Sequence, residues 1–116
     1  MANKEYIERL QGVIAHLHKC NAVWAQTVPV HEVFRGETIW RGDVEVFNLT
    51  GHPKAQRAYA WSHLDGPKDE RTRFVAVLQI PPVESAETAV RLQIVKDTKQ
   101  ARKEAIAEAK NTKKNT

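Results

Sequence analysis

The stretch WRGDVEVFNLTGHPKAQRAYAWSH, residues 40–63, decides which class of fold the chain can adopt. It holds two of the three Trp residues and two of the five His residues. Gly51 and Pro53 stand close together near its middle, where they favour a turn between two extended segments. Extended segments joined by so short a turn predict an antiparallel hairpin.

Residues 38–49 are expected to form the first strand of this hairpin. Trp40, Val44 and Val46 share one face of such a strand. Charged residues, Glu45 among them, fall on the opposite face. This alternation predicts a strand with one buried face and with Glu45 in solvent.

The second strand, residues 55–63, carries large side chains on one face and alanines on the other. The small alanine side lets a helix approach closely, so we expect the aromatic side to stay open. An open aromatic face is either functional or covered by another subunit, and its rings can stack on bases or other flat ligands. The predicted binding residues are Arg57, Tyr59, Trp61 and His63, with Trp40 and His52 as secondary candidates.

The segments before and after the hairpin complete the expected sheet. Apolar residues recur at helical spacing over 4–19, which predicts a helix followed by a linker over 22–27. Pro29 restricts residues 28–34 to an edge strand, because proline cannot donate to a central ladder. Residues 71–80 are apolar on both faces, which is typical of a central strand.

A second helix is expected after the sheet. Pro81 and Pro82 end the last strand, and Ser85 is a suitable N-cap for a helix reaching to about residue 110. The predicted fold is α+β, an antiparallel meander of three to four strands with both helices on one face (α-β-β-β-β-α). We expect one domain over 1–95, with 96–116 as a basic helical extension that ends in a disordered tail.

In outline this order resembles the double-stranded-RNA-binding domain, in which a helix, a meander and a closing helix also follow one another. That family has three strands and a basic start to its last helix. Here the last helix begins Ser85-Ala86-Glu87-Thr88-Ala89, which is not basic. The resemblance is therefore one of topology, and it assigns no site residues.

The charge of the chain is unevenly distributed. Residues 1–95 carry 11 basic and 11 acidic residues, whereas residues 96–116 carry seven basic and three acidic ones, so the whole excess of +4 lies in the extension. Such a segment either binds phosphate groups or forms a solvated helical face. Its secondary candidates for nucleic-acid binding are Lys99, Arg102 and Lys103.

The compartment and the cofactor content follow from simple counts. Cys20 is the single cysteine, which is the ordinary usage of a reducing compartment. The first residues lack a secretory signal, and no apolar run approaches the ~18 residues of a membrane span. His16 and Cys20 share a helix face, but a structural zinc site needs four ligands. We therefore expect a cytoplasmic protein without metal, cofactor or membrane contact.

Three hypotheses for function follow from these observations. The first is a small cytoplasmic binding module that self-associates, as a homodimer, through the aromatic sheet face. The second is a nucleic-acid-binding protein that uses this face together with the basic extension. The third is a small enzyme in which His52 or His63 works with a carboxylate, although no nucleophile stands at a diagnostic spacing.

Overall fold

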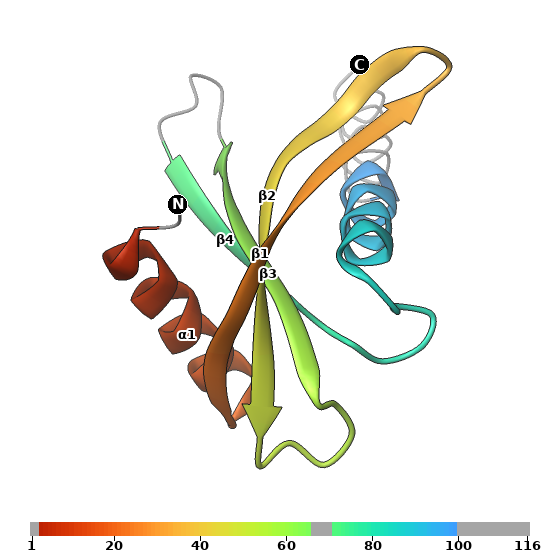
Figure 1. Ribbon diagram of the computed structural model, residues 1–116. Helices are drawn as coiled ribbons and strands as arrows, with labels where there is room; N and C mark the ends of the chain where they lie inside the picture. The colour runs from red at the N-terminus through yellow and green to blue at the C-terminus, as the bar shows by residue number, and fades with distance from the viewer. Residues whose placement is uncertain (1–2, 66–70, 100–116) are drawn as a thin grey trace, which may run out of the picture.

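The computed structural model describes residues 3–65 and 71–99 and confirms the α-β-β-β-β-α arrangement (Figure 1). All four strands belong to one antiparallel sheet, in the order β1-β2-β3-β4. A C-terminal helix follows over residues 86–99, and the rest of the predicted extension lies outside the described residues. The other elements are α1 (Lys4–His18), β1 (Asn21–Phe34), β2 (Glu37–Thr50), β3 (Arg57–Asp65) and β4 (Arg71–Leu78).

Helix α1 is bounded by local hydrogen bonds at both ends. The side chain of Asn3 accepts a hydrogen bond from the backbone N–H of Glu5 at 2.8 Å, as expected of an N-cap. At the other end, Lys19 adopts a left-handed conformation with φ of 54°, and its N–H donates to the carbonyl of Ala15. The chain is thereby redirected into β1 at Asn21.

Strand β1 is longer than its sequence indicates. The predicted linker over 22–27 is wrong, because these residues pair with β2 from Asn21↔Thr50 onward. The segment lacks apolar alternation, so its extended form depends on the partner strand rather than on its own pattern. The prediction that the Pro29 segment lies at the sheet edge is confirmed.

The two hairpins of the sheet share only a short contact. Strands β2 and β3 pair over Glu45–Asn48 and Arg57–Ala60, and beyond this point the β1–β2 and β3–β4 hairpins diverge (Figure 1). Residues 28–43 therefore form an arm that extends past β3. Strand β4 lies at the outer edge, so the prediction that it is central is wrong. Its apolar residues on both faces reflect a helix on each side of the sheet, not a central position.

One helix covers each face of the sheet, which corrects the expectation of two helices on one face. Helix α1 places Leu10 and Ile14 over Ala58 and Ala60, next to Phe47. On the other face the C-terminal helix places small side chains over large ones. That core contains Ala86, Ala89 and Val90 of the helix together with Val44, Val46, Tyr59 and Trp61 of the sheet.

Glu45 is buried, which corrects its predicted place in solvent. Only 1% of its surface is exposed, because α1 covers this part of the sheet. Its carboxylate oxygen Oε1 accepts hydrogen bonds from the indole Nε1 of Trp24 at 2.9 Å and from the hydroxyl of Thr27. These donors lie on the neighbouring strand β1, and they offset the cost of removing a carboxylate from water.

We expect the substitution Trp61→Ala to lower the free energy of unfolding by about 3–5 kcal/mol, since the indole is 2% exposed and its removal leaves a cavity. Urea unfolding followed by circular dichroism measures this loss. The control Ile39→Ala, at an exposed position of the arm, is expected to change the same quantity by about 0.5 kcal/mol or less. A loss below about 1 kcal/mol for Trp61→Ala would contradict an enclosed position for the ring.

Candidate functional site

The predicted aromatic stripe of β3 is not an open surface. Tyr59 and Trp61 are 3% and 2% exposed, because the C-terminal helix packs over them. The hydroxyl of Tyr59 donates to the carbonyl of Glu84, just before that helix, at 3.3 Å. Arg57 and His63 remain half-buried at the two ends of the stripe. The expectation of a continuous open face is therefore wrong.

Trp61 instead forms the wall of a cavity, which we call the Trp40–Trp61 pocket. The rings of Trp40 and Trp61 meet edge to face, with their centroids 5.8 Å apart and their planes at 70°. Beside them is a cavity of about 150 Å³ between β2, β3 and the C-terminal helix. Its lining residues are Trp40, Trp61, His63, Val90, Gln93, Ile94 and Asp97.

The position of Trp40 depends on the divergence of the hairpins and on Gly42. Where β2 leaves β3, the side chains of Trp40 in β2 and Trp61 in β3 still reach each other across the gap. Gly42 lies on the same face of β2 as Trp40, two residues further on. A Cβ atom at Gly42 would stand 3.1 Å from the Trp40 ring, so the absence of a side chain there lets the indole lie against the strand.

The polar wall of the pocket comes from one stripe of the C-terminal helix. Gln93 and Asp97 stand one turn apart, and the Gln93 Nε2 donates to Asp97 Oδ1 at 3.0 Å. Arg73 of β4 approaches the same oxygen with its Nη1 at 3.4 Å. Both side chains of this ion pair are close to half exposed, so the pair is weak.

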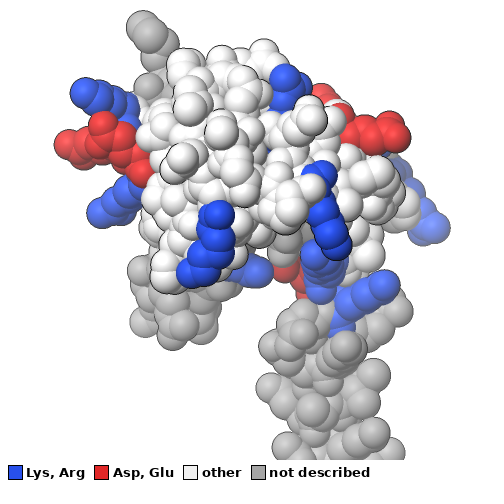
Figure 2. All heavy atoms as spheres, turned by 90° about the horizontal axis from the view of Figure 1, so that it is seen from below, with Lys and Arg blue, Asp and Glu red and all other residues white. Residues whose placement is uncertain are grey.

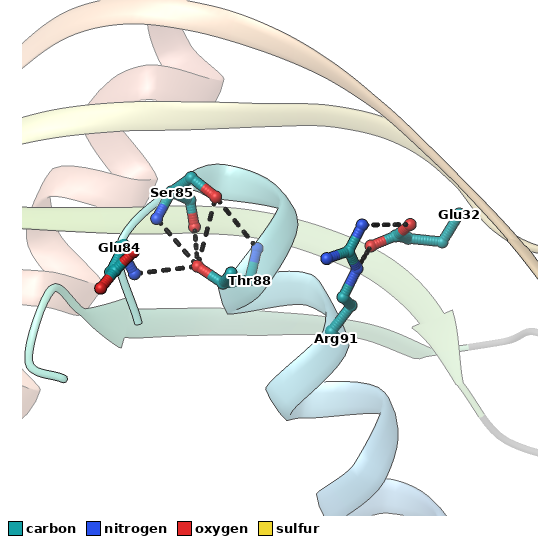
Figure 3. Close-up of polar contacts among 5 residues, drawn as sticks. All are labelled: Glu32, Glu84, Ser85, Thr88 and Arg91. Carbon is teal, nitrogen blue, oxygen red and sulfur yellow. Dashed lines mark hydrogen bonds and ion pairs between the residues drawn. The ribbon is translucent and has the colours of Figure 1, made fainter. Parts of the chain in front are cut away.

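The start of the C-terminal helix is fixed by a network of short-range hydrogen bonds (Figure 3). The hydroxyl of Thr88 accepts from the N–H groups of Glu84 and Ser85 at 2.9 and 2.8 Å. In return, the N–H of Thr88 donates to the hydroxyl of Ser85 at 3.2 Å. This pattern confirms Ser85 as the N-cap.

One turn further on, the helix is attached to the arm by an ion pair. Figure 3 shows the guanidinium of Arg91 facing the carboxylate of Glu32 in β1. Arg91 Nε contacts one carboxylate oxygen of Glu32, and Arg91 Nη2 contacts the other at 3.4 Å. Glu32 is buried, whereas Arg91 is largely exposed. The pair therefore holds the arm and the helix, two walls of the pocket, at a set distance.

The remaining predicted site residues lie elsewhere. His52 serves the β2–β3 turn, where its Nδ1 accepts from the N–H groups of Lys54 and Ala55 at 3.0 and 2.9 Å. His52 precedes β3, whereas His63 lies six residues after the first residue of that strand. Six extended residues span roughly 20 Å, so the two histidines do not share a site. Lys99 is exposed at the end of the described helix, and Arg102 and Lys103 lie outside the described residues.

Sequence reasoning missed the helical side of the pocket. Val90, Gln93, Ile94 and Asp97 follow the i, i+3, i+4, i+7 spacing of one helix face. That spacing was a usable signal for one helix face, but it does not show that Gln93 and Asp97 line a cavity.

Within residues 3–65 and 71–99, no group of three or more His, Cys, Asp or Glu side chains could hold a metal ion. In the same ranges, none of the helices is both long enough and apolar enough to cross a membrane.

No protein-family model matches the chain, and comparisons with curated proteins and with solved structures found no significant match. We therefore infer function from the chemistry of the pocket.

A double-mutant cycle tests whether the Glu32–Arg91 pair joins the helix to the arm. We expect Glu32→Gln and Arg91→Gln to show a coupling energy of about 1 kcal/mol, because Glu32 is buried and its contact with Arg91 involves both carboxylate oxygens. Urea unfolding of the two single variants and the double variant gives this energy. The matched control is the exposed Arg73–Asp97 pair, for which we expect about 0.3 kcal/mol or less. Equal coupling in the two cycles would argue against a special role for Glu32.

Proposed function

We propose that the protein is a small binding module that takes a ligand into the Trp40–Trp61 pocket. The observation that carries this proposal is the meeting of two indole rings, an imidazole and a carboxylate around one cavity of about 150 Å³. Apolar cavities of about this size in other proteins accept a single aromatic ring. The pocket combines apolar walls with a few polar groups, as small-molecule sites do.

Binding is favoured over catalysis by the composition of the pocket. His63 and Asp97 both line it, so an acid–base enzyme remains the alternative. However, the described lining contains no Ser, Thr, Cys or Lys side chain that could act as a nucleophile. A described lining with two indoles and no hydroxyl, thiol or amine nucleophile is better suited to holding a ligand than to transforming it.

The pocket is tested by filling it. We expect phenol to shift the indole N–H signals of Trp40 and Trp61 in NMR spectra, with a Kd on the order of 1 mM because so small a ligand has few contacts. Ile94→Phe adds a ring to the lining and should weaken binding at least tenfold, a factor of about 1.4 kcal/mol in free energy. Leu17→Phe, at an exposed position of α1 away from the pocket, is the control and should leave binding unchanged. Binding that survives Ile94→Phe would contradict this site.

We also propose that the protein self-associates, through the arm rather than through the aromatic stripe. Val33, Phe34 and Ile39 expose about half or more of their surfaces at the end of the β1–β2 hairpin. Among the described strands, β1 pairs with β2 alone, so one of its edges is open. A second copy supplies an identical edge, and antiparallel pairing of two β1 strands satisfies both.

Analytical ultracentrifugation tests this second proposal. We expect the wild-type chain to form dimers at concentrations on the order of 100 µM, and the double substitution Phe34→Ser, Ile39→Ser to raise the dimer Kd at least tenfold. Leu17→Ser changes an equally exposed apolar residue at the end of α1, away from the arm, and should leave the Kd unchanged. A wild-type chain that stays monomeric at this concentration would contradict the proposal.

Nucleic-acid binding remains the alternative hypothesis. Figure 2 shows Lys and Arg side chains spread over the end of the molecule where the β2–β3 connection lies, with Asp and Glu nearer its margins. Three basic residues belong to this end of the molecule. Lys19 caps the end of α1, Lys54 lies between β2 and β3, and Arg57 begins β3. The buried rings of Tyr59 and Trp61 are inaccessible to bases in this conformation, so such binding would rest on charge.

Cytoplasmic localisation remains a prediction from the single cysteine, Cys20.

A further inference from the structure

We infer that the ligand of the Trp40–Trp61 pocket is a small organic cation, an inference that rests on the proposed binding function. Trp40 is half-buried and lines the cavity, so its indole ring is the aromatic surface that a ligand meets there, while the buried ring of Trp61 closes the wall beside it. The face of an indole carries partial negative charge and attracts cations. Aromatic walls are how proteins hold ammonium groups whose methyl substituents prevent strong hydration.

The charge of the polar wall points the same way. Asp97 is the acidic residue among the described lining residues, and its Oδ1 already accepts from Gln93 and Arg73. The contact with Arg73 is long, at 3.4 Å, and exposed, so Arg73 neutralises the carboxylate only in part. A cation in the pocket would stand near Asp97 without losing the attraction of the Trp40 ring. An anion would meet repulsion from both.

The size of the cavity limits the part of a ligand that it encloses to a few heavy atoms. About 150 Å³ accommodates a single ring or a trimethylammonium group, but not a nucleotide or a folded peptide segment. Val90 and Ile94 supply apolar contacts for methyl groups. The apolar walls and the Asp97 carboxylate are therefore matched by a compact cation with an apolar surface.

Two probes of the same shape separate charge from fit. Choline and 3,3-dimethyl-1-butanol differ in having nitrogen or carbon at the centre of the bulky group, and therefore in charge. We expect choline to bind the full chain at least tenfold more tightly, measured by NMR shifts of the Trp indole signals. The neutral alcohol is expected to bind at the same site, through shape and apolar contact.

Substitutions at the polar wall test the role of charge, because they change the affinity for choline in opposite directions, which fit alone does not predict. Asp97→Asn keeps an oxygen acceptor for Gln93 but removes the charge, and should weaken choline binding at least tenfold while leaving the alcohol unchanged. Arg73→Gln removes a competing cation and should tighten choline binding severalfold. Asp43→Asn, at an exposed position outside the pocket lining, is the matched control for Asp97 and should have no effect on either probe.

The outcomes distinguish a failure of the cation inference from a failure of the proposed binding pocket. Equal binding of choline and the alcohol would overturn the cation inference and leave the binding pocket intact. Binding of neither probe, together with no response to phenol, would overturn both. Tight choline binding that is unchanged in Asp97→Asn and in Arg73→Gln would also overturn the cation inference, because the wall charge would then play no part. Thermal melting of each variant confirms that the compared chains are folded.

Discussion

The structure depends on a short length of strand pairing at its centre. Four residues of β2, Glu45–Asn48, pair with four of β3, Arg57–Ala60, and this is the strand pairing that joins the two hairpins of the described sheet. Both helices pack where the hairpins cross, so β2 is buried on both faces there. Beyond it, the hairpins diverge, and the pocket lies where Trp40 reaches back to Trp61. A longer β2–β3 ladder would close the space that the pocket occupies.

The choice of helix for each face follows from size. Leu10 and Ile14 fill the space above two alanines, while Ala86 and Ala89 leave room for Tyr59 and Trp61. Interiors pack to near-crystalline density, so a large side chain is best placed opposite a small one. This pairing turns the aromatic stripe from an exposed stacking surface into one wall of a cavity. The function suggested by the stripe changes accordingly, from surface contact to enclosure of a small ligand.

Two buried carboxylates form side-chain contacts between elements: Glu45 joins β2 to β1, and Glu32 joins β1 to the C-terminal helix. Glu45 receives the indole N–H of Trp24, and Glu32 receives the guanidinium of Arg91. Each carboxylate is made tolerable by partners from another element, because an unpaired charge in such a position is costly. Period-two alternation assigns Glu45 to solvent, since it describes the strand and not the helix that later covers it. In the same way, the spacing of residues along the C-terminal helix does not show that Asp97 faces a pocket.

The sequence by itself determined the features that arise within a few residues. The caps at Asn3 and Ser85, the edge position of the Pro29 segment and the antiparallel hairpin follow from local hydrogen bonding and backbone sterics. The side of the sheet that each helix covers, the burial of Trp61 and the meeting of Trp40 with Asp97 around one cavity were decided only by tertiary structure. A helical stripe shows that a face will be buried, but it does not show against which surface. That choice depends on the fit of side chains far apart in the chain, a property of the assembled core rather than of any one segment.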